Sequence, residues 1–239
     1  MKTVLSKIGF FTKKFLKYSA ITVGVTILIA TPIVAYKVKT IIDKAPVITE
    51  KMLRSEATSN MYDKKGNVIW SQTDIRRNYI KYDKLPDLYV KLLLNTEDDT
   101  FFQDRGVSIK GLANAILSRG RRGGSSIEQQ LIKNVAFSSD VKDRTIDRKV
   151  KEFWLALQLD TNWNKKQILE CYVNKITMGE GSFGANTVAI TYYGTSLDKM
   201  SERTPENIAR LAYIAGLGQA PSGYNAYDHP EEANRRKNI

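Results

Sequence analysis

The hydrophobic and polar positions divide this chain into one uncharged N-terminal run and a longer region with helical periodicity. Residues 18–36 read YSAITVGVTILIATPIVAY and carry no charge. A helix of about 20 apolar residues is what a hydrocarbon core of ~30 Å requires, so this run predicts a transmembrane helix. The alternative is a cleaved signal peptide. Such peptides have apolar runs of about 7 to 15 residues before an A-x-A-like site, and neither feature fits this segment well.

Beyond residue 86, apolar residues recur at the three- and four-residue spacing of amphipathic helices. Pro86 is a favourable first helical residue, and the pattern that it opens ends at Thr96-Glu97. Further helices are expected over residues 109–117, 127–136, 150–159, 167–173, 185–193 and 208–215. The one convincing β signal is Lys65-Gly66-Asn67, a turn between two strand-like runs. The predicted fold class is therefore mainly α, with a small N-terminal β-hairpin and a single N-terminal transmembrane helix.

These patterns give the chain its expected segments. We expect a basic tail over residues 1–17, the span over 18–36, a membrane-proximal stalk over 37–60 and one domain over 61–239. Residues 1–36 contain five lysines and no acidic residue. Three lysines also follow the span, but the positive-inside rule still favours a cytoplasmic N-terminus and a domain outside the membrane.

Composition excludes some kinds of site and favours some kinds of partner, but it does not identify the reaction. The formal net charge is +12, from 37 basic and 25 acidic residues, which favours a partner that carries phosphate: nucleic acid, anionic lipid or a diphosphate. Cys171 is the only cysteine, so neither an intrachain disulfide nor a cysteine-based zinc site is available. His229 is the only histidine, and nothing in the sequence supports a serine, histidine and acid triad around it. We predict no metal ligands among the side chains.

Glu97 opens the block TEDDTFF, in which three acids stand beside Phe101 and Phe102. Like charges and nearby apolar surface both raise the pKa of a carboxyl, which is how a glutamate is brought towards work as a general base near neutral pH. A solvated acidic helix end is the alternative interpretation.

The block GGSSIEQQLIKN places a flexible glycine pair before a helix start. Ser125 and Glu128 have the S-x-x-E spacing of a capping box, which gives both residues a structural explanation. Gln129 has no such explanation. Gln130, Lys133 and Asn134 lie near one helix face and form a polar strip suited to sugar hydroxyls and a phosphate.

In the block DRKVKE, Arg148 and Glu152 stand four residues apart on one predicted helix. A surface salt bridge is one interpretation, but a base that precedes an acid is the weaker order for helix stability. Stability is therefore an incomplete explanation of the pair. Arg144 extends the stripe if the helix begins that early.

Taken in order, these blocks resemble those of the peptidoglycan glycosyltransferases, glycosyltransferase family 51. This module stands alone in monofunctional transglycosylases or at the front of class A penicillin-binding proteins. The family's ED-x-x-F block resembles residues 97–101, and its G-G-S-T-x-x-Q-Q-L-x-K-N block resembles residues 123–134. Its R-K-x-x-E block resembles residues 148–152, and its I-L-E-x-Y-x-N block resembles residues 168–174. The resemblance runs from about Met61 to the end, where IAGLGQAPSGYN is also recognisable.

The resemblance implies a lysozyme-like fold and an inverting enzyme that polymerises lipid II into glycan chains during cell-wall biogenesis. By similarity, Glu97 is the base that deprotonates the 4-hydroxyl of the acceptor sugar, and Glu152 is the second essential acid. The substrate-binding residues implied for the sugars and the diphosphate are Lys133, Arg144, Arg148, Lys149, Ser126, Gln129, Gln130 and Asn134. No cofactor is required, although Glu152 is also suited to orient a divalent cation, Mg²⁺ or Mn²⁺, at the diphosphate.

The expected partners are lipid II, the growing glycan chain and membrane lipid, together with proteins of cell division or elongation. The expected location is the bacterial cell membrane, in single-pass form with an extracytoplasmic catalytic domain. A weakened scaffold that binds lipid II and a lytic, lysozyme-like glycosidase remain as alternative functions. Nucleic acid is not an expected partner, because the anchor places the domain outside the cytoplasm.

The chain departs from the family pattern at several positions. Asp104 stands where the family usually has histidine, and Glu128 where it usually has threonine. Residues 177–179 replace a common aromatic Y-F-G, and Gly218 is a minor change. Asp104 matters most, because another acid near Glu97 alters its titration. The chain ends within a continuing helical pattern, so we expect a truncated chain that lacks a following transpeptidase domain; a naturally monofunctional enzyme is the alternative.

Overall fold

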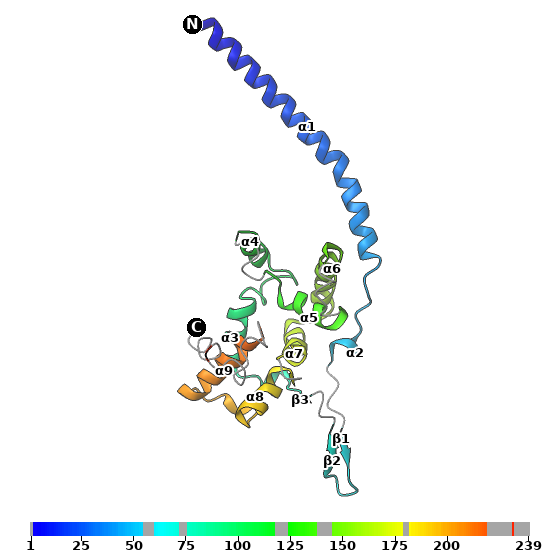
Figure 1. Ribbon diagram of the computed structural model, residues 1–239, viewed down its shortest axis with the longest axis vertical. Coiled ribbons are helices and arrows are strands. Elements are labelled where there is room, and N and C mark those ends of the chain that lie inside the picture. The colour runs from blue at the N-terminus through cyan, green and yellow to red at the C-terminus, as the bar shows by residue number, and fades with distance from the viewer. Residues whose placement is uncertain are drawn as a thin grey trace. The chain divides into compact units, whose positions relative to one another are not determined.

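A computed structural model describes residues 2–54, 60–71, 76–117, 124–137, 145–178, 182–218 and 231 (Figure 1). The chain separates into two compact units, residues 1–45 and residues 46–239. The first unit consists mainly of one helix. The second unit is a helical domain that carries short strands.

Helix α1 (Lys2–Ile42) contains the apolar run. Within it, residues 17–42 form a stretch of 26 residues that contains an 18-residue window with a mean hydropathy of 1.9, which is long and apolar enough to cross a membrane. The hydroxyls of Thr22, Thr26 and Thr31 each donate to the carbonyl oxygen one turn earlier. These bonds leave no threonine hydroxyl of the run facing hydrocarbon without a partner, as a lipid environment requires. The predicted N-terminal apolar helix is confirmed, and it extends beyond residues 18–36 on both sides.

The second unit begins with helix α2 (Glu50–Leu53) and two short strands. Strands β1 (Asn60–Tyr62) and β2 (Val68–Ser71) pair in antiparallel fashion. The Asp63 carboxylate accepts hydrogen bonds from the backbone N–H groups of Lys65 and Asn67 between them, each at 2.8 Å. Gly66 adopts a φ of 84°, which glycine reaches without steric cost.

A second, parallel pair joins β3 (Arg76–Arg77) to β4 (Ser182–Phe183). The expectation of a single β signal was therefore wrong. Each of these strands has two residues, too few for an alternating pattern to be recognisable in the sequence.

The helices that follow are a 3₁₀ turn η1 (Tyr82–Lys84), α3 (Asp87–Glu97), α4 (Ile109–Leu117), α5 (Ile127–Ala136), α6 (Ile146–Asn162), α7 (Lys165–Lys175), α8 (Ala185–Tyr193), a 3₁₀ turn η3 (Leu197–Met200) and α9 (Pro205–Leu217). The predicted bounds of α4, α5 and α8 are confirmed to the residue. Pro86 is the N-cap of α3 and not its first helical residue. The mainly α fold class is confirmed.

Helices α6, α7 and α9 begin earlier than predicted because polar residues cap them outside the apolar pattern. The hydroxyls of Thr145 and Thr204 accept from backbone N–H groups three residues later. Asn164 and Gln167 form a reciprocal capping box at the start of α7. Hydrophobic periodicity locates a helix, but such caps decide where it begins.

Helix α5 lies at the centre of this unit, beside α6 and α7 (Figure 1). Its apolar side chains Ile127, Leu131 and Ile132 are fully buried. Helix α3 packs on α9, the other main contact between helices. The element that carries Glu97 and the helix that carries the GGSS block therefore belong to the same core.

Candidate functional site

Glu97 is the last residue of α3 and is tied to α5 by its carboxylate. Gln130 Nε2 donates a hydrogen bond to Glu97 Oε2 at 3.0 Å. The hydroxyl of Tyr172, on α7, donates in turn to Gln130 Oε1 at 3.0 Å. Because Oε1 accepts from tyrosine, Nε2 must face Glu97, so the orientation of the amide is fixed.

Aromatic side chains surround this carboxylate. Tyr89 and Tyr172 are fully buried. Burial first, and the charge of Glu97 second, raise the pKa of the Tyr172 hydroxyl well above its usual range, and the same two causes raise the pKa of Tyr89. Tyr172 therefore acts only as a hydrogen-bond donor to Gln130. Glu97 itself is half-buried and Asp98 is buried, so the interpretation as a solvated acidic helix end describes only the exposed Asp99.

The three acids of the first block point to different partners. Asp98 is buried, and its Oδ2 accepts from the backbone N–H of Ile127 at 3.2 Å. Asp99 is more exposed and forms an ion pair with Lys110. The expectation that these three carboxylates crowd together was thus wrong. The pKa of Asp98 is raised, first by burial and then by the charge of Asp104.

The start of α5 is capped by Ser126 and Gln129. Ser126 Oγ accepts from the backbone N–H of Gln129 at 3.2 Å, and Gln129 Oε1 accepts from the backbone N–H of Ser126 at 3.0 Å. The predicted box of Ser125 and Glu128 was wrong by one residue. Ser126 is the residue whose hydroxyl also reaches the carbonyl oxygen of Gly106, at 2.7 Å, which fixes it at the N-cap. Both capping side chains are engaged within the fold, and their role in substrate binding stays a prediction.

The second candidate acid, Glu152, is fully buried and paired with two cations. Arg148 Nε lies 3.0 Å from Glu152 Oε1, and Lys149 Nζ lies 2.6 Å from Glu152 Oε2. Arg148 is also buried. A surface salt bridge was therefore the wrong interpretation of this pair. Lys149 also donates to Ser125 Oγ at 3.1 Å, which links α6 to the segment before α5.

Arg144 lies outside the described residues. Helix α6 begins at Ile146 with Thr145 as its extended N-cap, and the place of Arg144 in the stripe stays a prediction. Of the other predicted residues, Lys133 is half-buried and Asn134 is exposed on α5. Both lie within one turn of Gln130 and are its neighbours on the helix surface.

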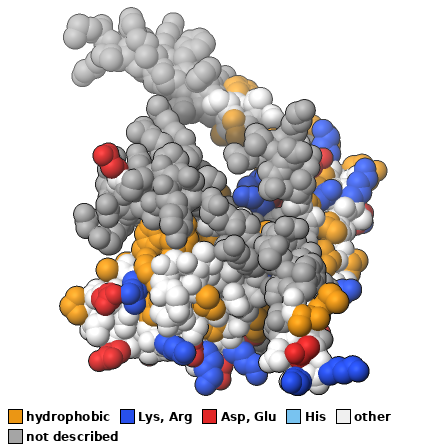
Figure 2. Space-filling view, turned by 60° about the horizontal axis from the view of Figure 1, so that its bottom comes forward, with side chains coloured by type: hydrophobic (Ala, Val, Ile, Leu, Met, Phe, Trp, Pro, Cys, Tyr) orange, Lys and Arg blue, Asp and Glu red, His pale blue; other side chains and the backbone are white. Residues whose placement is uncertain are grey.

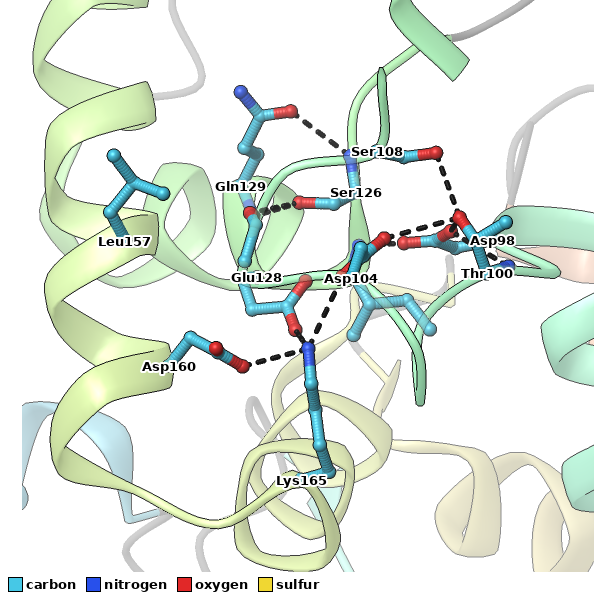
Figure 3. Close-up of polar contacts among 12 residues, drawn as sticks. Asp98, Thr100, Asp104, Ser108, Ser126, Glu128, Gln129, Leu157, Asp160 and Lys165 are labelled. Atoms are coloured by element: carbon cyan, nitrogen blue, oxygen red, sulfur yellow. Dashed lines mark hydrogen bonds and ion pairs between the residues drawn. The ribbon is translucent and has the colours of Figure 1, made fainter. Parts of the chain in front are cut away.

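The sequence did not reveal a further cluster of charged side chains, which is drawn in Figure 3. We call it the Lys165 cluster: Lys165 Nζ lies 3.2 Å from Asp104 Oδ1, 2.6 Å from Glu128 Oε1 and 2.7 Å from Asp160 Oδ1. The ammonium also lies 4.6 Å from the centre of the Phe101 ring. No single motif signals this arrangement, because its members come from a loop and three helices.

The carboxylates of Asp98, Asp104 and Glu128 are also close enough together to bind a metal ion, with oxygens within 4.8 Å of one another. Lys165 is already bound to two of these three carboxylates and supplies positive charge there. A cation would have to displace the ammonium, so the donor set fits a metal poorly. Figure 2 shows one face of the molecule, on which the described Lys and Arg side chains lie among acidic and hydrophobic ones.

Comparison with known proteins identifies the blocks. Residues 65–239 match the family described as Transglycosylase. Penicillin-binding protein 1A of Streptococcus pneumoniae (strain ATCC BAA-255 / R6) is 38% identical over 202 residues, which are 83% of this chain and 27% of that protein. Penicillin-binding protein 1A/1B of Bacillus subtilis (strain 168) is 32% identical over 204 residues, which are 83% of this chain and 21% of that protein. The chain thus spans less than a third of these relatives.

Among solved structures, penicillin-binding protein 1A from Haemophilus influenzae is similar over 77% of this chain and 17% of its own. The sequence identity is 23% and the TM-score 0.40, a likeness too low to support conclusions about the fold.

Proposed function

This chain belongs to the transglycosylase family of peptidoglycan glycosyltransferases, and on that basis we propose that it polymerises lipid II into glycan chains by inverting glycosyl transfer. The observation that carries the proposal is the carboxylate of Glu97, held by Gln130 at a half-buried helix end. Glu97 takes the proton from the 4-hydroxyl of the acceptor sugar. The oxygen then forms a bond to the anomeric carbon of the donor, and the bond from that carbon to the diphosphate oxygen breaks with inversion.

The leaving group decides what else the site needs. A glycosidase uses one carboxylic acid to protonate a poor leaving group, whereas a diphosphate leaves with its charge and needs cations. Lys133, Arg148 and Lys149 supply such charges from α5 and α6, and Arg144 precedes α6 in the chain. Asn134 and Gln130 offer amides to the sugar hydroxyls.

Glu152 is best suited to an orienting role. A buried carboxylate between Arg148 and Lys149 has its charge compensated, and it fixes where both cations point. Because Glu152 is fully buried and both of its oxygens face these cations, it is poorly placed to reach a glycosidic oxygen, which argues against a lytic glycosidase. The divalent cation at the diphosphate stays a prediction, and no step here depends on it.

We also propose the finer placement of the chain. Helix α1 anchors it in the cell membrane through residues 18–36, with the N-terminal tail in the cytoplasm and residues 37–60 as a stalk. Residues 61–239 form a lysozyme-like catalytic domain that includes the β1–β2 hairpin and faces outward. A tethered domain searches the bilayer surface to which the lipid tail confines its substrate. The partners are lipid II, the growing glycan and proteins of cell division or elongation.

Incubation of the purified protein with lipid II tests the function directly. The expected product is a ladder of glycan chains with release of polyprenyl diphosphate. Binding of lipid II without turnover would indicate a scaffold, and cleavage of finished cell wall would indicate a lytic enzyme. Either outcome would overturn the proposal.

A further inference from the structure

The Lys165 cluster joins four segments of the domain through one ammonium group. Lys165 is the first residue of α7. Its three carboxylate partners come from the loop after α3, from the first turn of α5 and from the last part of α6, and they are Asp104, Glu128 and Asp160. Figure 3 shows these side chains converging on the lysine. A single partly buried cation therefore links these elements to one another.

The loop after α3 is bound to this cluster through Thr100. The Thr100 hydroxyl lies 3.0 Å from Asp98 Oδ1, 3.1 Å from Asp104 Oδ2 and 2.9 Å from Ser108 Oγ. Asp98 carries the connection onward, because its other oxygen accepts the backbone N–H of Ile127. Besides the bond between Ser126 and Gly106, the loop is thus attached to α5 through two acidic routes, one through Asp98 and one through Asp104, Lys165 and Glu128.

Both attachments lie next to the candidate catalytic contact. Glu97 directly precedes Asp98, and Gln130 stands two residues after Glu128. The hydrogen bond between Gln130 and Glu97 joins α5 to the end of α3, and the Lys165 cluster holds α5 to the loop that follows α3. A shift of the α3 end against α5 would therefore change this bond.

Charge makes the lysine hard to replace. Burial alone would lower the pKa of Lys165, but hydrogen bonds to Asp160 and Glu128 raise it, so the side chain stays cationic. Without the ammonium, the carboxylates of Asp104, Glu128 and Asp160 would repel one another in a partly desolvated site. Breaking a buried ion pair by removing one partner costs more than the pair contributes.

We propose that Lys165 is a positioning residue for Glu97, and that Asp104 and Glu128 affect glycosyl transfer by acting through this ammonium. The inference rests on the proposed function. It also gives a joint reason for two departures from the family pattern: the acids at positions 104 and 128 both bind the same lysine. Asp104 therefore acts on Glu97 through geometry and not as a neighbouring charge.

The test compares five single variants of the full chain in detergent micelles. Lys165→Met removes the ammonium, and Lys165→Arg keeps the charge. Asp104→Asn and Glu128→Gln each neutralise one partner without changing its shape. The matched control is Lys166→Met, because Lys166 is the next residue on α7, is exposed and contacts the Tyr82 ring. Initial rates of lipid II polymerisation give kcat and KM for each protein.

We expect kcat of Lys165→Met to fall about 10- to 100-fold, with KM changed less than about 2-fold, because a misplaced catalytic group loses rate before binding. The kcat of Asp104→Asn and of Glu128→Gln should fall less. Lys165→Arg should retain most of the wild-type kcat. Adding Asp104→Asn to Lys165→Met should bring no further loss, since both act through one contact. Lys166→Met should match the wild type.

Amide hydrogen exchange provides a second measurement, which does not depend on enzymatic activity. Backbone amides of residues 98–108 and of Ile127 should exchange faster in Lys165→Met and Asp104→Asn than in Lys166→Met. If Lys165→Met does not fold, the Asp104→Asn and Glu128→Gln variants decide the matter. Unchanged kcat in both, or unchanged exchange in the loop, would overturn the inference.

The two proposals fail in different ways. An inactive wild type would contradict the proposed function. The hydrogen-exchange measurement would still test whether the Lys165 cluster holds the loop in place. An active wild type with unaffected cluster variants would contradict only the positioning role. A loss confined to KM would also contradict it, because it would place Lys165 in substrate binding.

Discussion

Gln130 donates its side-chain amide to the carboxylate of Glu97 across the boundary between α5 and α3, with 3.0 Å between Nε2 and Oε2. A neutral donor of this kind holds a carboxylate in place without adding charge to it. The amide is oriented in turn by Tyr172, so a buried hydroxyl on α7 controls the direction of a donor on α5. The candidate base is thus positioned by two residues that do not themselves titrate in the neutral range.

Replacing Tyr172 with phenylalanine should slow the reaction while the protein stays folded. The change removes the hydroxyl that fixes Gln130, which frees the amide to turn away from Glu97. We expect kcat to fall about 3- to 10-fold and the free energy of unfolding to fall by about 1 kcal/mol. The matched control is Tyr89→Phe, because Tyr89 is equally buried but its hydroxyl has no hydrogen-bond partner among the described residues. Equal losses in both variants would contradict the relay.

Glu152→Gln should destabilise the domain strongly. The substitution leaves Arg148 buried without its charged partner. In other proteins such a change lowers the free energy of unfolding by ~3–5 kcal/mol. Denaturant unfolding measures the loss. Glu206→Gln is the control, because Glu206 makes the same four-residue pairing with Arg210 at an exposed site, where such pairs contribute ~0.5 kcal/mol or less. A similar small effect in both variants would show that Glu152 is not a buried ionic centre.

Glu128 should make stability depend on pH. Burial raises the pKa of its carboxyl from the usual 4.5 to about 7, and Lys165 opposes this shift. The folded protein holds the proton more tightly than the unfolded chain does. The stabilising contribution is therefore complete below pH 4.5 and is lost as the pH rises through 7.

Glu128→Gln removes this dependence. The free energy of unfolding of the wild type, minus that of the variant, should fall between pH 4.5 and 7. The fall should be at most roughly 3 kcal/mol, at ~1.4 kcal/mol per pKa unit. Urea unfolding at a series of pH values measures it, and a constant difference across that range would refute the prediction.

Gly106→Ala should destabilise the loop after α3. Gly106 has a φ of +83°, and an added Cβ would lie 2.5 Å from the carbonyl oxygen of Ala156 on α6. Gly66 has a φ of +84° with nothing within 4 Å of such a Cβ, so Gly66→Ala measures the backbone cost alone. We expect the free energy of unfolding to fall by about 1 kcal/mol in Gly66→Ala and by at least ~2 kcal/mol in Gly106→Ala, measured by denaturant unfolding. Equal costs would mean that the loop does not press against α6.

The sequence located the helices of the second unit because their apolar periodicity is strong, and α4, α5 and α8 have the predicted bounds. It also named Glu97, Gln130 and Glu152, whose motifs lie within single segments. It placed the cap of α5 on Ser125 because two adjacent serines offered the same spacing. Only the contact of Ser126 with Gly106, 20 residues away, decides between them.

The Lys165 cluster could not be predicted from spacing. Asp104 and Glu128 were visible as unusual acids, but their common partner belongs to α7 and is brought to them by tertiary packing. The burial of Glu152 was hidden for the same reason. An i,i+4 pair has the same sequence pattern whether its helix face is exposed or covered by another helix.

The most direct test of Glu97 as the general base compares Glu97→Gln with Asp99→Asn in lipid II polymerisation. Both changes neutralise one acid of the same block, but Asp99 is more exposed and pairs with Lys110, away from Gln130. We predict a loss of at least ~100-fold in kcat for Glu97→Gln, the contribution expected of a general base, and near wild-type activity for Asp99→Asn. Normal chain formation by Glu97→Gln would contradict the assignment of Glu97 as the base.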